Sequence, residues 1–243
     1  MNIGIIPARW ASTRFPGKPL VEIAGKPLLL RVYENALRAR RLDQVIIATD
    51  DDRIYQAALA WGARVFMTSP AHPTGSDRLA EVARKLPRSR IIVNIQGDEP
   101  LLKPAVIDAL VGAMHRDRTV PVATVARTID RTEELENPNV VKVVFDRHGH
   151  ALYFSRHTIP FVRDAQNAAE ARHYKHLGLY AYRRHYLLKF VKMKPGKLEN
   201  IEKLEQLRIL ENGDSLRVVL TSSDSIGVDT PADAARVEKL LTR

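Results

Sequence analysis

The stretch IIPARWASTRFPGKPL, residues 5–20, begins as an apolar strand and ends as a loop that carries three positive charges. Its apolar start continues the run 3–6, whereas three prolines and a glycine prevent the remainder from forming a helix. Arg9, Arg14 and Lys18 therefore lie on a loop directly after the first strand. Because like charges repel one another, this arrangement predicts a polyanion bound among them.

The first half of the chain repeats this order, in which an apolar strand is followed by a helix. Strands are expected at 3–6, 45–48, 64–67, 91–95 and 120–126, and helices at 27–40, 51–61, 76–86 (with Ser76 as its N-cap) and 104–116. Apolar strands that alternate with helices indicate a mostly parallel sheet covered on both faces. The sequence thus predicts a three-layer α/β fold that binds ligands at the carboxyl ends of its strands.

The pattern changes after Asn139. A β-hairpin is expected from the runs 140–145 and 151–154, and a further strand at 177–182. A helix is expected at 199–211 with Ile201, Leu204, Leu207 and Leu210 on its buried side, followed by a strand at 217–220 and a last helix from 231. We interpret residues 1–243 as one domain with an insertion in its second half.

Composition narrows the class of protein. The chain of 243 residues has no cysteine, which excludes disulfides and thiolate metal sites, and no apolar run of the ~20 residues that a membrane helix needs. No signal peptide is apparent at the N-terminus, so we expect a cytoplasmic location. The net charge of +10 raises the alternative of nucleic-acid binding, but the basic residues are spread along the chain and no RNA-binding or zinc-finger signature occurs. We therefore expect a small anionic substrate, no nucleic-acid partner and no membrane insertion.

Several enzyme classes lack their motifs in this sequence. The dinucleotide fingerprint, the P-loop, the G-x-S-x-G elbow of serine hydrolases and the H-E-x-x-H motif of zinc proteases are all absent. These absences count against hydride transfer, P-loop NTPases, serine hydrolases and zinc proteases.

Two aspartates are candidate metal ligands. The strand 91–95 leads to Asp98, and Gly97 beside it permits a close approach of the backbone to a ligand. Asp229 follows another apolar stretch, although Asp-Thr-Pro at 229–231 also fits a helix start with proline in its first turn. One or two carboxylates with substrate phosphates form the usual Mg²⁺ site. Together with the loop cations, they predict a site for a nucleoside triphosphate and magnesium.

The sequence resembles the sugar nucleotidyltransferases and, within them, the 3-deoxy-manno-octulosonate (Kdo) cytidylyltransferase family. The resemblance rests on IIPARWASTRFPGKPL, ATDDDR, HPTGSDRLAE, VNIQGDEP, NPNVVKVVFD, ALYFSRHTIPF, KHLGLYAYRR, LEQLR and GVDTPAD, which occur in the family's order over nearly the full chain. The first and fourth segments indicate only the broad superfamily. ALYFSR, HLGLYAY and LEQLR are more specific.

The resemblance implies a homodimeric enzyme with a Rossmann-like nucleotidyltransferase fold that uses Mg²⁺ and converts CTP and Kdo to CMP-Kdo and diphosphate for lipopolysaccharide biosynthesis. It divides the chain into a nucleotide-binding core (1–130), a sugar-binding and dimerisation subdomain (131–215) and a return to the core (216–243). Implied nucleotide-binding residues are Ala8, Arg9, Arg14, Lys18, Thr49, Thr74, Gly75, Ser76, Arg78 and Asp98. Implied sugar-binding residues are Gln96, Arg156, His176, Tyr180, Glu205 and Gln206. Lys18, Asp98 and Asp229 are the implied catalytic residues, with both aspartates as metal ligands.

Two positions depart from the family pattern, and other functions stay open. Trp10 stands where tyrosine is frequent, and Thr74-Gly75-Ser76 replaces a frequent Ser-Gly-Thr, which bears on base selectivity. The acceptor could instead be a sialic acid or an amino variant of Kdo, although ALYFSR and HLGLYAY favour Kdo over sialic acid. Other classes are a nucleotide-binding regulator without catalysis and a nucleic-acid binder. The presence of Lys18 with both aspartates argues against the regulator.

Overall fold

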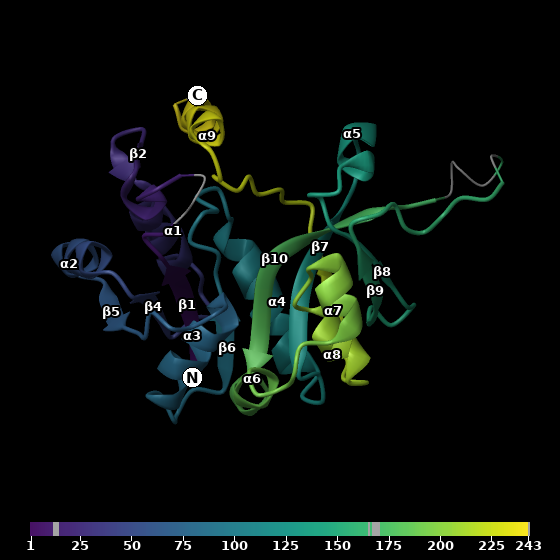
Figure 1. The fold of residues 1–243 in the computed structure, drawn as a ribbon, viewed down its shortest axis with the longest axis horizontal. Coiled ribbons are helices and arrows are strands. Elements are labelled where there is room, and N and C mark those ends of the chain that lie inside the picture. Colours follow the sequence, from purple (N-terminus) through teal and green to yellow (C-terminus); the bar gives the residue numbers. More distant parts are fainter. Residues whose placement is uncertain (12–14, 165, 167–170, 243) are drawn as a thin grey trace.

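The computed structural model describes residues 1–11, 15–164, 166 and 171–242. Its central sheet has the strand order β11-β7-β10-β6-β1-β4-β5, with β8 and β9 attached beside β10 (Figure 1). These strands are β1 (Asn2–Ala8), β4 (Gln44–Thr49), β5 (Arg64–Met67), β6 (Ile91–Asn94), β7 (Val122–Thr128), β8 (Lys142–Phe145), β9 (Ala151–Ser155), β10 (Tyr174–Arg183) and β11 (Leu216–Leu220).

Most neighbouring strands of the central sheet run parallel. The strands β6, β1, β4 and β5 form one parallel group, and β11 is parallel to β7. The exception is β10, which runs antiparallel between β6 and β7. The predicted α/β fold with a mostly parallel sheet is therefore confirmed. Because β10 belongs to the range 131–215, that range also supplies a central strand and is not confined to a lobe beside the core.

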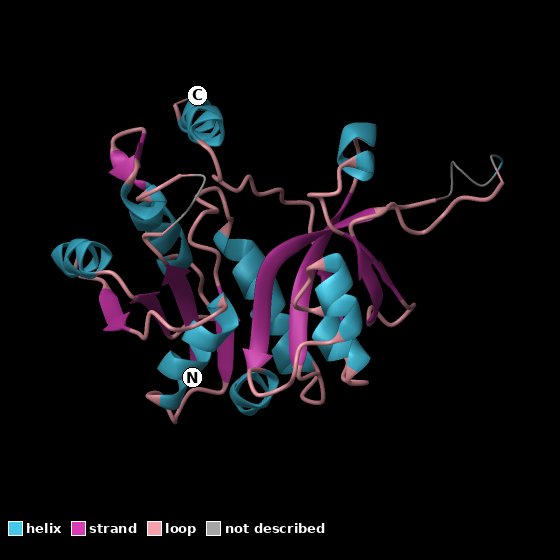
Figure 2. Ribbon diagram, viewed as in Figure 1, coloured by secondary structure: helices cyan, strands magenta, loops and turns pink. Residues whose placement is uncertain are grey.

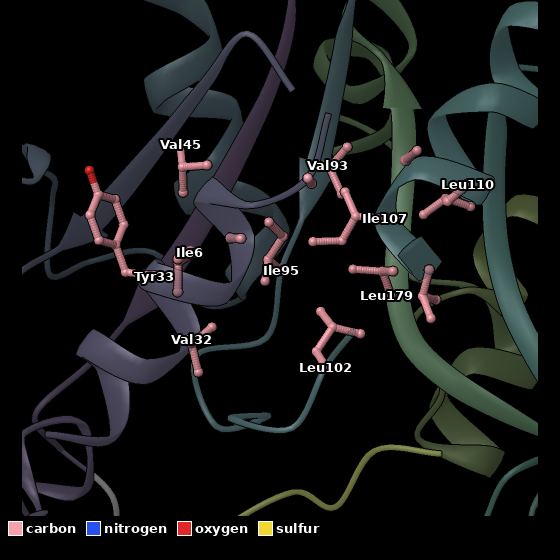
Figure 3. Close-up of a cluster of buried hydrophobic side chains, with 14 of the residues drawn as sticks. Ile6, Val32, Tyr33, Val45, Val93, Ile95, Leu102, Ile107, Leu110 and Leu179 are labelled. Carbon is pink, nitrogen blue, oxygen red and sulfur yellow. The ribbon is translucent and has the colours of Figure 1, made fainter. Parts of the chain in front are cut away.

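Helices cover both faces of the sheet, as Figure 2 shows. One face packs against α1 (Leu28–Leu37), α2 (Asp52–Ala60) and α4 (Pro104–Arg116), and the other against α3 (Gly75–Arg84) and α6 (Arg184–Phe190). Side chains alternate between the two faces along a strand, so Ile6 lies in the first core and Ile5 in the second. Figure 3 shows the first core, where Ile6 and Leu179 of the sheet, with Ile95 directly after β6, face Val32 of α1 and Ile107 of α4.

The predicted helix 199–211 is wrong as a single element. The structure has α7 (Lys197–Glu202) and α8 (Leu207–Glu211), separated at Lys203, whose φ of 54° is left-handed. The backbone N–H of Leu204 donates to the carbonyl of Glu199 and closes the turn. Ile201, expected on the buried side, is 77% exposed, whereas Leu204 is buried. Because the left-handed Lys203 ends α7, Ile201 and Leu204 do not share one buried helical face.

The N-cap expected at Ser76 lies two residues earlier. Thr74 has extended backbone angles, and its hydroxyl accepts from the backbone N–H of Asp77, which caps α3. Ser76 lies inside the first turn and is therefore available for a side-chain contact elsewhere.

The remaining elements are short segments outside the central sheet and the C-terminal helix. They are the 3₁₀ turn η1 (Lys18–Leu20), the short strands β2 (Glu22–Ile23) and β3 (Lys26–Pro27), α5 (Thr132–Glu136) and α9 (Pro231–Leu241). The segment 221–230 runs from β11 to α9, and α9 buries Val237 against Ile23 and Leu28. Among the helices of the described residues, none is long and apolar enough to cross a membrane.

Candidate active site at the carboxyl edge of the sheet

A cleft of about 370 Å³ lies at the carboxyl ends of β1 and β6. Four segments far apart in the sequence form it. They contribute Ala8 at the end of β1 with Arg9 directly after it, Lys18 in η1, Gln96 and Asp98 after β6, and Asp229 before α9. The cationic loop and the two predicted metal ligands therefore meet in one cleft, as the rule for parallel sheets requires.

Lys18 is the central side chain of this cleft. Its Nζ donates to Oδ2 of Asp98 at 2.8 Å and to Oδ1 of Asp229 at 3.1 Å. Burial alone would lower the pKa of Lys18, but the attraction of Asp98 and Asp229 outweighs it and raises the pKa above its usual value. Lys18 is therefore a permanent cation, and its ammonium holds the two carboxylates toward a common point.

Backbone contacts fix this convergence. The N–H of Val228 donates to the carbonyl of Asp98 at 2.9 Å, which attaches the segment 221–230 to the loop after β6. A Cβ atom at Gly97 would lie 3.0 Å from the carbonyl oxygen of Pro7. The close approach that glycine permits here is thus between the loop after β6 and the end of strand β1. Gly17, with a φ of 70°, turns the chain into η1 and presents Lys18 to the cleft.

Asp229 lies at a helix start and also faces the cleft, so both interpretations of Asp-Thr-Pro apply. The helix α9 does begin here, but its capping box is made by Thr230 and Asp233, with Pro231 in the first turn. The carboxylate of Asp229 is not needed as a cap and instead contacts Lys18.

The two carboxylates fit a magnesium site that substrate phosphates would complete. No group of three or more acidic or histidine side chains suited to a metal occurs among the described residues. Two carboxylates that face the same cation are nevertheless the protein contribution expected where phosphate oxygens supply further ligands. The metal assignment of Asp98 and Asp229 stays a prediction.

A second group of predicted residues surrounds β10 and contains mostly neutral side chains. Nε2 of His176 lies 2.8 Å from the hydroxyl of Thr124, and its ring contacts Phe154 and Tyr180. Desolvation by these neighbours lowers the pKa of His176 to about 3, so the ring is neutral. Burial likewise raises the pKa of Tyr180 well above its usual value, which keeps its hydroxyl protonated.

Glu205 joins this group from the break between α7 and α8. Its Oε2 accepts from the hydroxyl of Ser76 at 2.7 Å. Burial raises the pKa of Glu205, although the hydrogen bonds of Ser76 and Thr74 oppose the rise. The broken helix therefore has a function in the fold, because it brings Glu205 to the start of α3.

Gln96 connects the charged cleft with the neutral group. Its amide Nε2 donates to the carbonyl of Gly178 at 2.8 Å, at the irregularity in β10 between Leu177 and Tyr180. A Cβ atom at residue 178 would lie 3.5 Å from this amide, an ordinary van der Waals contact, so Gln96 packs directly against β10. One side chain thus contacts both parts of the candidate site.

The other predicted site residues lie outside the cleft or are covered. Arg78 is fully buried, with its guanidinium 2.6 Å from Asp50 and bonded to the hydroxyl of Thr68, so in this structure it offers no surface to a nucleotide. Arg156 lines a different hollow and donates to the carbonyls of Pro138, Glu202 and Lys203. Thr49 and Gln206 are buried, Gly75 opens α3 beside Thr74, and Arg14 lies outside the described residues.

Sequence reasoning missed a network of ion pairs beside the site. Arg127 of β7 and Lys175 of β10 each pair with Glu134 of α5 at 2.8 Å and with Asp224 at 3.0 and 2.7 Å. Asp224 belongs to the segment 221–230 that carries Asp229. The network therefore anchors this segment to the sheet. The one sign of this network in the sequence is that Arg127 and Lys175 lie within otherwise apolar strands.

Comparisons with known proteins agree with this architecture. Residues 3–219 match the family model described as cytidylyltransferase. A 3-deoxy-manno-octulosonate cytidylyltransferase of Geobacter sulfurreducens is 54% identical over 99% of this chain and 100% of its own, and that of Geobacter metallireducens is 52% identical over 98% and 97%. A solved structure of CMP:2-keto-3-deoxy-manno-octonic acid synthetase complexed with CTP superposes with a TM-score of 0.94 at 41% identity, covering 100% of this chain and 99% of the other. The chain belongs to the 3-deoxy-manno-octulosonate cytidylyltransferase family.

Proposed function

We propose that this protein transfers the cytidylyl group of CTP to Kdo and releases diphosphate. The observation that supports this most directly is Lys18 held between Asp98 and Asp229 at the carboxyl edge of the sheet. The cleft has the cations for a triphosphate and the carboxylates for its metal ion. The names of the relatives supply the base and the sugar.

In this reaction the anomeric hydroxyl of Kdo attacks the α-phosphorus as diphosphate departs. The chain supplies positioning and charge, and needs no covalent intermediate. Lys18 would leave its carboxylates to contact phosphate oxygens and stabilise the charge that develops on them. Asp98 and Asp229, so released, would hold Mg²⁺, which supplies Lewis-acid polarisation and reduces the repulsion between the two anionic substrates when it is bound.

The neutral group around β10 suits the sugar. His176, Tyr180 and Gln96 offer hydrogen bonds to hydroxyl groups without adding net charge. Arg156 is the predicted partner of the sugar carboxylate. Its guanidinium now contacts backbone carbonyls, so that role requires a movement of Arg156 or of the segments around it.

The homodimer belongs to the same proposal. Ile201 and Phe161 are 77% and 82% exposed, and Ile201 lines the hollow that also contains Arg156 and His157. A second copy that covers these side chains would remove apolar surface from water. Light scattering after size-exclusion chromatography tests this, because Phe161→Asp should shift a dimer to monomer. A cytoplasmic location and a role in lipopolysaccharide synthesis stay predictions.

The decisive experiment measures diphosphate release with each nucleoside triphosphate, with and without Kdo. We expect release only with CTP, Kdo and Mg²⁺ together. Release without a sugar would indicate simple hydrolysis, and equal rates with all four triphosphates would contradict the base assignment. Matched reactions with a sialic acid and with amino-Kdo identify the acceptor, because a higher kcat/KM for either would replace Kdo in the proposal.

A further inference from the structure

A second hollow, of about 420 Å³, lies at the opposite edge of the sheet, beside the N-terminal ends of β1 and β6. Figure 1 shows this edge near the N-terminus and α6, whereas α9 lies at the other edge. The hollow is lined by six basic side chains and by no aspartate or glutamate. The six are Arg90, Arg118, Arg183, Arg184, His115 and His185.

Two of these arginines are held in place by backbone carbonyls. Arg183 donates through Nε to Val120, and through one terminal nitrogen to Met114 and Asp117, and Arg184 donates through Nε to Ala83. Within the described part of the chain, neither one forms an ion pair with a carboxylate, and the same holds for Arg90 and Arg118. Carbonyl oxygens satisfy hydrogen bonds but leave the positive charge unneutralised.

Burial, together with repulsion from neighbouring arginines, lowers the pKa of two of these groups. Burial and then Arg118 lower the pKa of Arg183, against the weaker opposition of Asp117. Burial and then Arg41, Arg183 and Arg118 lower the pKa of His115. Asp43 and Asp117 are the carboxylates that oppose these shifts, but each contributes less than the arginines do and neither lines the hollow. The hollow therefore has a positive field that the chain itself does not cancel.

We propose that this hollow binds a small anion with at least two phosphoryl groups. Four arginines carry more positive charge than one phosphate balances. The guanidinium groups of Arg90 and Arg118, which donate no hydrogen bond within the described residues, can each donate two parallel hydrogen bonds to phosphate oxygens. A volume of about 420 Å³ is in the range of small-molecule sites, and a concave site focuses the positive field on a small ligand. The proposal does not depend on the proposed reaction, because none of these residues lines the cleft that contains Lys18.

Calorimetry with inorganic diphosphate as the probe tests the proposal. All titrations use the Lys18→Ala protein without magnesium, which weakens phosphate binding in the cleft at the carboxyl edge equally in every variant. The test variant adds Arg90→Glu and Arg118→Glu, because both side chains are exposed and donate no hydrogen bond within the described residues. Its matched control adds Lys192→Glu and Lys194→Glu, which change the net charge equally but lie away from the hollow. Thermal unfolding checks that both variants are folded.

We expect the test variant to bind diphosphate at least tenfold more weakly than its parent, while the control retains the parent's affinity. An unchanged affinity in the test variant would overturn the proposal, and so would an equal loss in the control, which would indicate non-specific attraction. A parallel titration with CTP distinguishes the source of the phosphates: the same loss for CTP includes nucleotides among the ligands, and a loss for diphosphate alone restricts the site to inorganic anions. If only binding of an RNA homopolymer were lost, the occupant would be a nucleic acid and the proposal would be wrong.

Discussion

Basic side chains have different partners at the two edges of the sheet. At the carboxyl edge, buried or partly buried cations meet carboxylates, as Arg127 does with Glu134 and Lys18 does with Asp98. At the opposite edge, Arg183 and Arg184 meet only carbonyl oxygens in the described part of the chain. Both arrangements satisfy hydrogen bonds, but only the first one neutralises charge.

This difference in partners indicates a different function for each edge. Removing a charge from water is costly, and a carboxylate partner offsets part of that cost while it also fixes geometry. The carboxyl edge is therefore a preorganised site whose charges must be exchanged when substrates arrive. The opposite edge keeps its charges in partial contact with water and has a field that only an external anion would cancel.

The largest effect is expected from Asp98→Asn, which removes a charge from the carboxyl edge without changing the size of the side chain. Turnover should fall by ~10²–10³ because one preorganised charged group is lost, while the unfolding temperature changes little. Diphosphate release at saturating magnesium measures the turnover, and scanning calorimetry measures the unfolding temperature. Asp117→Asn at the opposite edge is the control and should leave turnover unchanged. Near-normal turnover of Asp98→Asn would remove the metal assignment and make the two edges equivalent for catalysis.

The next effect concerns stability. Glu134 is 8% exposed and pairs with Arg127, Lys175 and Arg131 at 2.8, 2.8 and 3.0 Å. Glu134→Gln should cost about 3 kcal/mol, because it leaves buried cations with too little negative charge. At roughly 2–4 °C per kcal/mol for a chain of this size, scanning calorimetry should detect a fall of about 10 °C.

Asp130→Asn is the matched control, because Asp130 also pairs with Arg127, at 2.9 Å, but is 70% exposed. Exposed ion pairs contribute little, so its unfolding temperature should stay close to that of the parent. If the two substitutions had equal effects, burial would not be what makes pairing important at the carboxyl edge.

Much of the fold followed from local patterns. Apolar strands ending in polar residues placed Asp98 at the correct edge, because strand direction and side-chain alternation are local properties. The break at Lys203 was missed because Ile201, Leu204 and Leu207 repeat at helical spacing, and only tertiary packing exposes Ile201. The cap was misplaced by two residues because serine is by type the better capping residue, yet the backbone is extended at Thr74.

The candidate site was predictable where residues follow strands and unpredictable where they meet through tertiary structure. The convergence of Lys18 and Asp98 follows from topology, and for Asp229 the resemblance favours a metal ligand over a plain helix start. Nothing local predicts that Arg78 is directed to Asp50 or that Asp224 anchors the segment that carries Asp229. The arginine hollow could not be foreseen either, since Arg118 and Arg183 are 65 positions apart and meet only because β10 returns beside α4.

A third prediction uses the neutral His176. Its pKa is about 3 in the folded chain and about 6.5 when unfolded, so below pH 6.5 the unfolded chain binds more protons. This histidine therefore contributes no pH dependence above pH 6.5, and stability falls as the pH decreases toward 3, by at most about 1.4 kcal/mol per pH unit. Urea unfolding between pH 7.5 and 5 should show a steeper loss for the parent than for His176→Gln. His148→Gln, in an exposed turn, should keep the parent's slope, and identical slopes in all three proteins would mean that His176 is accessible to protons.

The smallest effect tests the uncancelled field at the opposite edge. Burial and then Arg41, Arg183 and Arg118 hold the pKa of His115 below its usual value, so Arg118→Gln should raise it slightly by removing one positive neighbour. The ring signal of His115 in an NMR titration measures this shift, with Arg38→Gln as a control outside the hollow. Added diphosphate should raise the same pKa in the parent protein, because a bound anion favours the charged imidazole. A pKa of His115 that responded to neither change would show that solvent already screens these arginines, and the contrast between the two edges would then be one of geometry alone.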